Sequence, residues 1–405
     1  MLRVWNLSLL CATFCLTILG TFLTRSGVIE SVHAFSDGPL GAYLLAFFAL
    51  AAGTSVALIG WRGDRLRSPG SIDSPLSREG AFLANNLVFS LFAFVVLLGT
   101  VFPLIVEALQ DRRLSVGRPF FDRMTTPLGL ALLTLMAIAP VLPWRKASAE
   151  LLRQRLFWPA CLGVACIVVP VLLGADGITA LLAFGLGGFA AGSALRQLVL
   201  ATRRQGWRGL VGRANGGMIV HLGIIVLAVA FAAQTSYQRV GEFRLAPGDS
   251  ASFGGHTFTL VDQVLEDTPA AAIQKAHIQI DGGQVYAPAL QLYKARGDNV
   301  ATPSVRTGLT QDIYLTLLKP SSAADDHVTF GVRLMPMTVW LWVGGLLVAG
   351  GTVLAAFPGR RRRRPTDPVS APIRVDAGSA PVTDADAPDL IGVPRAGRRL
   401  GAADV

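Results

Sequence analysis

The stretch Gly217–Ala233, which reads GMIVHLGIIVLAVAFAA, decides the fold class of this chain of 405 residues. It contains a single ionisable side chain, His221, and no charged residue. A helix of about 20 apolar residues crosses the hydrocarbon core of a bilayer, which is roughly 30 Å thick. The stretch therefore predicts a membrane span, in which an ionisable side chain normally faces the protein interior and serves a function.

Seven further stretches of the chain are long and apolar enough to cross a bilayer in the same way. They are Val4–Leu23, Leu40–Trp61, Leu83–Leu104, Leu128–Trp144, Phe157–Leu173, Ile178–Leu195 and Met337–Phe357. The whole chain agrees with this pattern, because only 15% of its residues are charged, against about 25% in soluble domains. The sequence thus predicts a polytopic α-helical membrane protein with eight spans.

The charged residues are mostly basic, 36 Lys+Arg against 26 Asp+Glu. They are scattered between apolar runs rather than gathered in one domain, which excludes a nucleic-acid binder. With a cytoplasmic N-terminus, the internal loops 62–80, 145–156 and 196–213 hold four, four and five basic residues. The external loops 24–39, 105–127 and 174–177 hold one, four and none. Because basic residues favour the cytoplasmic side, we expect both termini inside a bacterial inner membrane.

Residues 234–336 form a long polar segment that differs from the rest of the chain and falls outside the cytoplasm. Strand-length runs at 257–261, 277–280 and 312–317 are rich in β-branched residues or alternate in polarity, which is typical of strands. Turn residues separate them at Gly254-Gly255, Asp281-Gly282-Gly283 and Gly297-Asp298. The sequence predicts a small all-β external domain here. The Arg-rich segment 358–405 is expected to be a disordered cytoplasmic tail, where arginines could also meet anionic membrane lipid.

Two histidines are candidate ligands. His221 suits a metal or haem iron, because neutral imidazole is a common ligand of both, and nearby Gly216, Gly217 and Gly223 would leave room for a bulky neighbour. His33 lies in the loop after the first span, close to Arg25, which can pair with a carboxylate. The alternative for His221 is a hydrogen bond to a neighbouring helix.

The remaining histidines and the cysteines are assigned no chemical role. The cysteines follow no disulfide, CxxC or zinc spacing, and we expect them to act as small apolar residues. The chain has no CxxCH sequence, so it is not itself a c-type cytochrome. These residues are His256, His277, His327, Cys11, Cys15, Cys161 and Cys166.

Several blocks of the sequence, in order along residues 3 to 357, together resemble CcmF, the large haem lyase subunit of cytochrome c maturation. The blocks are Val4–Leu9, Gly20–Gly27, Ser31–Phe35, Ser77–Glu79, Asn85–Asn86, Gly99–Leu104, Ser115–Gly117, Phe120–Asp122, Pro143–Lys146, Asp312–Tyr314 and Pro336–Trp342. The resemblance implies a component that holds haem at the outer membrane face while the CxxCH thiols of an apocytochrome c add to its vinyl groups.

The same resemblance implies roles for individual residues. His33 matches an external haem ligand in a haem-handling loop, 24–39, and His221 matches an axial ligand of a transmembrane b-type haem. Arg25 is a candidate partner of a haem propionate, and no catalytic residue is assigned. The domain organisation expected is transmembrane helices in 1–233, the external β-rich domain in 234–336, a last transmembrane helix in 337–357 and the tail. Expected partners are apocytochrome c, a haem chaperone and other maturation subunits.

The sequence also departs from the family pattern. The family's tryptophan-rich segment, its other external histidine and its other axial histidine precede the part that matches here. We therefore expect either a second polypeptide that supplies the missing half, or a truncated or misassigned gene. As a haem lyase subunit the chain would be incomplete alone. Two other functions remain open: a membrane transporter for haem or another small molecule, and a non-catalytic scaffold for cytochrome assembly.

Overall fold

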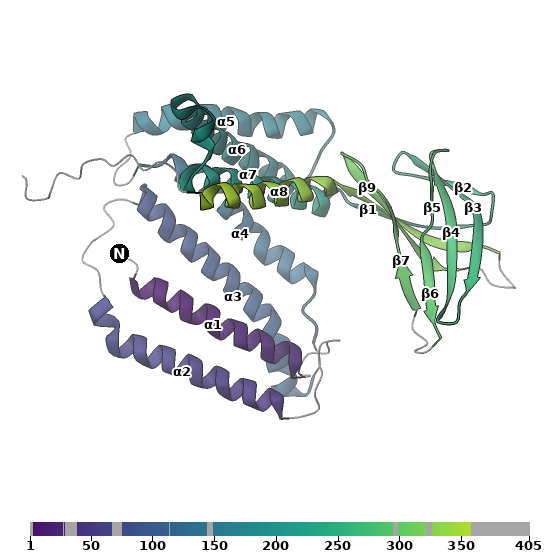
Figure 1. Cartoon of the computed structure of the whole chain (residues 1–405), viewed down its shortest axis with the longest axis horizontal. Coiled ribbons are helices and arrows are strands. Elements are labelled where there is room, and N and C mark those ends of the chain that lie inside the picture. The colour runs from purple at the N-terminus through teal and green to yellow at the C-terminus, as the bar shows by residue number, and fades with distance from the viewer. Residues whose placement is uncertain are drawn as a thin grey trace, which may run out of the picture. The chain divides into compact units, whose positions relative to one another are not determined.

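The computed structural model describes residues 3–26, 28, 39–66, 75–112, 114–143, 149–294, 299–320 and 326–357. Within these residues, eight helices are long and apolar enough to cross a membrane, and a β-rich domain follows the seventh (Figure 1). The predicted fold class is confirmed. The helices are α1 (Arg3–Arg25), α2 (Leu40–Leu66), α3 (Arg78–Gln110), α4 (Arg118–Ile138), α5 (Ala149–Leu172), α6 (Ile178–Gln205), α7 (Arg213–Tyr237) and α8 (Thr338–Ala356).

Helices α4, α6 and α7 share a buried apolar cluster. Its buried members are Leu133 and Ala137 of α4, Ala183 and Ala190 of α6, and Ile225 of α7. Small residues on α6 let the backbones approach closely, which is the main way that helices associate in a membrane. On another face of α6, Gly185, Gly188 and Gly192 pack against α5.

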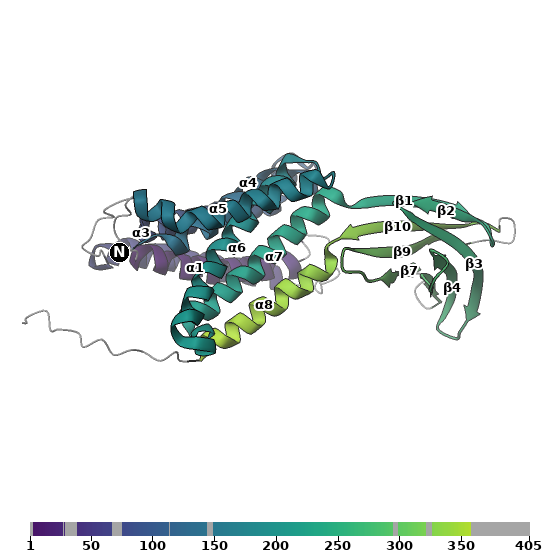
Figure 2. The same ribbon diagram turned by 90° about the horizontal axis from the view of Figure 1, so that it is seen from above.

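Helices α7 and α8 pack side by side (Figure 2). Glycines line the contact between them. A Cβ added at Gly216 would lie 2.5 Å from the backbone nitrogen of Ala355. A Cβ added at Gly223 would lie 2.7 Å from the carbonyl oxygen of Gly344. Only glycine permits approaches this close, so Gly216 and Gly223 serve contact with α8. The expectation that these two glycines leave room for a bulky neighbour is wrong.

The predicted external loop 105–127 is largely helical. Helix α3 continues to Gln110 and ends at Asp111, which adopts a left-handed conformation with φ of 50°. Helix α4 begins at Arg118, with a proline in its first turn, a position where the missing N–H of proline costs nothing. Arg118 and Arg123, two of the four basic residues counted in this predicted loop, therefore belong to α4.

The short 3-10 helix Ala139–Val141, which follows α4, is held by donors from three other helices. Arg78 of α3 and Gln197 of α6 both donate to the carbonyl oxygen of Pro140, over 2.9 and 3.2 Å. Arg155 of α5 donates to the carbonyl oxygen of Val141 over 3.0 Å. Carbonyls at the end of a helix lack intrahelical donors, so these side chains satisfy groups that would otherwise be buried without partners.

The described residues of the β domain form ten strands in two sheets. In one sheet the order is β1-β10-β9-β8; in the other it is β2-β3-β4-β6-β7, with β5 paired to β4. All the pairs are antiparallel. The strands are β1 (Arg239–Leu245), β2 (Ser250–Phe253), β3 (His256–Asp267), β4 (Ala271–Ile280), β5 (Val285–Tyr286), β6 (Ala289–Tyr293), β7 (Asn299–Thr302), β8 (Ser304–Arg306), β9 (Gln311–Lys319) and β10 (Val328–Pro336).

Alternating side chains of the two sheets build the core of this domain. Phe258 and Leu260 of β3 meet Leu315 of β9 and Phe330 of β10 in one buried cluster, as expected where successive residues of a strand face opposite sides. The three predicted strand runs lie within β3, β4 and β9. Of the predicted turns, Gly254-Gly255 joins β2 to β3, both with positive φ, whereas Gly297-Asp298 lies outside the described residues.

Candidate functional site

His221 lies within α7, far from either end of the helix. Its Nδ1 atom is buried and has no hydrogen-bond partner within the described part of the chain. A buried polar atom without a partner costs about 1–3 kcal/mol, so such atoms usually have an explanation, for example a bound ion or group. The alternative of a hydrogen bond to a neighbouring helix through this atom finds no partner among the described helices.

The glycines around His221 have different surroundings. Gly216 and Gly223 are in contact with α8, as described above, whereas a Cβ added at Gly217 would meet no atom within 4 Å. Gly217 precedes His221 by four residues, so the two lie on the same side of the helix. Of the three glycines expected to leave room for a neighbour, Gly217 alone does so.

Arg25 is the last residue of α1 and lines an open groove of about 660 Å³ between the end of α1 and the start of α2. The groove is walled by hydroxyl groups and aliphatic side chains. Each of the threonines donates its hydroxyl hydrogen to the helix backbone. The lining residues are Thr17, Gly20, Thr21, Thr24, Arg25, Leu40 and Leu44.

The other residue predicted for this region, His33, lies outside the described residues, as does most of the loop 24–39. Arg25 and His221 belong to different groups of packed helices, since α1 packs on α2, and α7 packs on α6 and α8. In the described part of the chain, no cluster of three or more His, Cys, Asp or Glu could hold a metal ion.

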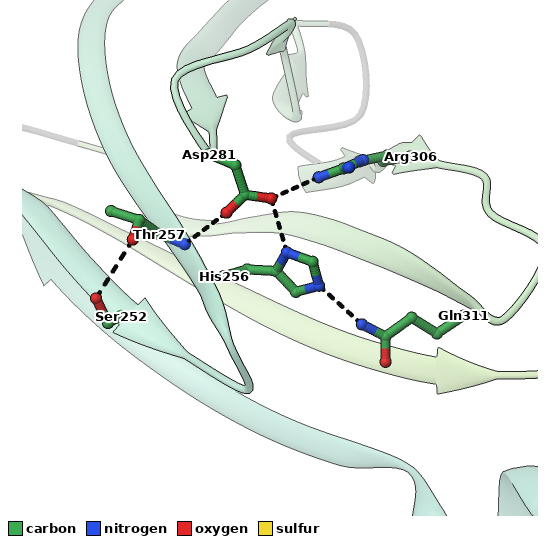
Figure 3. A network of polar contacts seen from close by, with 6 residues as sticks. All are labelled: Ser252, His256, Thr257, Asp281, Arg306 and Gln311. Carbon is green, nitrogen blue, oxygen red and sulfur yellow. Dashed lines mark hydrogen bonds and ion pairs between the residues drawn. The ribbon is translucent and has the colours of Figure 1, made fainter.

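A polar network that the sequence analysis did not assign joins the two sheets of the β domain (Figure 3). Asp281 accepts hydrogen bonds from the backbone nitrogen of Thr257 at 2.9 Å and from Arg306 at 2.8 Å. His256 Nδ1 lies 2.7 Å from the same carboxylate, and its Nε2 accepts from Gln311 at 2.8 Å. His256, Thr257 and Asp281 belong to one sheet and its turn, and Arg306 and Gln311 to the other.

Hydrogen bonds keep the carboxyl group of Asp281 ionised. The backbone N–H of Thr257 first, then His256 and Arg306, hold the pKa of Asp281 well below its usual range. A carboxylate that accepts several hydrogen bonds is stabilised in its ionised form. The sequence indicated a turn at Asp281-Gly282-Gly283. It did not indicate that His256 and Arg306, each 25 positions away, would contact Asp281.

His277 is paired in a similar way within one sheet, where its Nδ1 contacts Asp262 on the neighbouring strand. The four cysteines are free thiols. Cys166 packs against Gly188 of α6, at which an added Cβ would lie 2.6 Å from the sulfur. This is the small apolar role that was expected for it.

Comparisons with known proteins identify relatives along most of the chain, although no protein-family model matches it. The cytochrome c-type biogenesis protein CcmF of Pseudomonas aeruginosa is 32% identical over 370 residues, which cover 89% of this chain and 56% of that protein. CycK of Bradyrhizobium diazoefficiens is 32% identical over 392 residues, covering 92% and 58%. CcmF of Escherichia coli is 31% identical over 383 residues, covering 91% and 58%.

A solved structure of the cytochrome c heme lyase CcmF superposes with a TM-score of 0.70 at 29% sequence identity. The superposition covers 88% of this chain and 55% of that one. The chain thus spans about half the length of the curated relatives that it matches.

Proposed function

Because the chain belongs to the CcmF family of cytochrome c-type biogenesis proteins, we propose that it works as part of a cytochrome c haem lyase. In this proposal it holds haem at the outer face of the bacterial inner membrane. There the two cysteine thiols of an apocytochrome CxxCH sequence add across the haem vinyl groups and form thioethers. The reaction is mainly a problem of positioning, for which a rigid binding site supplies most of the rate gain.

The observation that carries this proposal is His221. An imidazole in the middle of a membrane helix, with a buried Nδ1 that lacks a partner, fits an axial ligand of a resident b-type haem. One nitrogen would bind iron, and the other would donate to a group that fixes the ring orientation, as metal-bound histidines usually do. Such a haem would relay electrons that keep the substrate iron reduced.

The outer site would be formed at the end of α1. We propose that His33 ligates the iron of the substrate haem and that Arg25 pairs with a propionate, since guanidinium binds carboxylate through two parallel hydrogen bonds. The groove beside Arg25 supports this assignment, because it combines hydroxyl groups with apolar walls from Leu40 and Leu44. That mixture matches an amphiphile with an acidic edge and an apolar body.

The chain contributes one histidine to each proposed haem, so each site needs further ligands from outside this sequence. A polypeptide that carries the tryptophan-rich segment of the family is the expected source. The β domain would dock apocytochrome c, a haem chaperone or other maturation subunits. The basic residues of the loops support an orientation with both termini in the cytoplasm.

The test is a reduced-minus-oxidised visible spectrum of the detergent-purified chain, expressed alone and with a tryptophan-rich partner. We expect a b-type haem signal with the partner, and its loss in His221→Ala. His277→Ala is the matched control, because His277 lies in the β domain and contacts Asp262 instead. A second variant, His33→Ala, should keep the b-type signal and lose the substrate haem.

An unchanged b-type spectrum in His221→Ala would refute the assignment of the resident haem. Normal loading of substrate haem in His33→Ala would refute the outer site. If neither preparation contains haem, the haem-binding role is refuted, and the scaffold and transporter functions become the alternatives to test.

A further inference from the structure

The connection between α6 and α7 is a short 3-10 helix, Gly206–Leu210, that folds back along the end of α6. A Cβ added at Gly209 would lie 2.4 Å from the carbonyl oxygen of Ala201, so this glycine rests directly on the backbone of α6. Asn215 of α7 donates a hydrogen bond to the carbonyl oxygen of Gly209. The connection is therefore held in place by both of the helices that it joins.

This connection presents one aromatic ring and several cationic side chains at the protein surface. Trp207 is 83% exposed, although Gly209, two residues later, is buried. Arg203 and Arg204, in the last turn of α6, and Arg208 in the connection are exposed as well. We call Arg203, Arg204, Trp207 and Arg208 the basic–aromatic patch. Its position is set by the packing of the backbone at Gly209.

The length of α6 places this patch at the level of the lipid headgroups. The helix has 28 residues, which span about 42 Å at 1.5 Å per residue. A bilayer with its headgroup regions is roughly 40–45 Å thick, so a helix of this length that begins at one surface ends at the other. Because the connection folds back to Ala201, the patch stays at this surface instead of extending into water. In the orientation proposed above, this is the surface of the cytoplasmic leaflet.

The elements around the patch do not balance its positive charge. From Gly177 to Gly241, a range that includes α6, the connection and α7, the chain has no Asp or Glu. Helix α5 packs against α6 and has one carboxylate, Glu150, which accepts a hydrogen bond from Gln154 of its own helix. Guanidinium groups bind phosphate through two parallel hydrogen bonds. The patch is therefore suited to a phosphate group.

We propose that the basic–aromatic patch binds the headgroup of an anionic phospholipid. The arginines would contact the phosphate, as basic residues next to a membrane span do with anionic lipid. The ring of Trp207 would lie at the boundary between headgroups and acyl chains, where tryptophan is enriched in membrane proteins. A soluble protein partner would account for the arginines but not for an exposed tryptophan at headgroup depth. Lipid accounts for the charge, the ring and their depth together.

The experiment titrates the full chain, purified in detergent, with phosphatidylglycerol or phosphatidylcholine and counts bound lipid by native mass spectrometry. We expect the parent chain to prefer phosphatidylglycerol. Arg204→Gln and Arg208→Gln should each weaken its binding by about fivefold, since a basic residue near an anionic lipid surface contributes about 1 kcal/mol, and Trp207→Ala should weaken it too. The matched control is Arg153→Gln, which removes the same charge from an exposed position of α5, three residues after Glu150, and should keep its lipid.

Thermal unfolding of the same proteins provides a second readout and shows that each variant is folded. A ligand that binds the folded state raises the unfolding midpoint, so phosphatidylglycerol should stabilise the parent chain and Arg153→Gln more than Arg204→Gln or Arg208→Gln. Inorganic phosphate at the same concentration should not reproduce this stabilisation.

Three outcomes would overturn the proposal. The first is equal binding of the two lipids by the parent chain. The second is unchanged phosphatidylglycerol binding in Arg204→Gln and Arg208→Gln, or an equal loss in Arg153→Gln, which would mean that net charge alone decides. The third is equal stabilisation by inorganic phosphate, because the patch would then recognise a free anion rather than a lipid.

Discussion

Two neighbouring glycines of α8 provide a sharp test of how α7 and α8 are held together. A Cβ added at Gly351 would lie 2.7 Å from the backbone nitrogen of Val220 and 2.9 Å from the carbonyl oxygen of Gly216. A Cβ added at Gly350 would meet no atom within 4 Å. Gly351→Ala and Gly350→Ala therefore make the same chemical change in the same helix, once inside the interface and once outside it.

The magnitude follows from the contacts. Ordinary contact begins at 3.4 Å, so the methyl group of Gly351→Ala is too close by about 0.7 Å to backbone atoms, which cannot rotate away. The two helices must separate, and overpacking of this kind typically costs about 1–3 kcal/mol. Alanine favours the helix over glycine by up to about 1 kcal/mol in both variants, so this gain cancels in the comparison.

The measurement is thermal unfolding of both variants in one detergent, followed by the far-ultraviolet circular dichroism of the helices. We expect Gly351→Ala to unfold at a lower temperature than Gly350→Ala, by about 2–4 °C for each kcal/mol. The parent chain should fall between them or match Gly350→Ala. Equal midpoints for the two variants would refute the close approach of α7 and α8 at Gly351.

Two further predictions concern polar contacts. Asp281→Asn should speed hydrogen exchange in β3 and β4, with a loss of roughly 1 kcal/mol after allowance for the exposure of this side chain, whereas Glu242→Gln, at an exposed position of β1, should not. Because the folded state lowers the pKa of Asp281, the stability that its carboxylate contributes is complete above about pH 4 and declines at lower pH. The stabilities of the parent chain and Asp281→Asn should therefore converge in acid. A difference in stability that persists into strong acid contradicts this origin. Arg155→Met should destabilise the helices by about 1–3 kcal/mol, since it leaves the buried carbonyl of Val141 without its donor. Arg153→Met, at an exposed position of the same helix, should not change the unfolding midpoint. Equal unfolding midpoints for Arg155→Met and Arg153→Met would exclude the role of Arg155.

Much of the fold could be predicted from the sequence because it depends on local patterns. An apolar run of about 20 residues can satisfy its backbone in a bilayer only as a helix, so the stretch Gly217–Ala233 and its seven counterparts identified the spans. The strand runs of the β domain were found for a similar reason, since β-branched residues and alternation act over a few neighbours. The ends of the spans were less certain, as the helical residues 105–110 and 118–127 show.

Some properties of the candidate residues could likewise be predicted from the sequence, and others could not. His221 stood out in the sequence because hydrocarbon makes an ionisable side chain costly wherever its helix packs. The surroundings of His221 could not be predicted, because Gly216, Gly217 and Gly223 look alike in the sequence and differ only in the atoms that lie next to them. Likewise, the groove beside Arg25 exists only because α1 and α2 pack together.

The sequence by itself determined the membrane class of the protein, the number of its spans, its β domain and the histidine inside the membrane, because each depends on residues close together in the chain. The tertiary structure decided which glycines contact α8 and which side of α7 stays open, and it brought Asp281 to His256 and Arg306. These features depend on the packing of elements that lie far apart in the sequence, and no local pattern encodes which elements become neighbours.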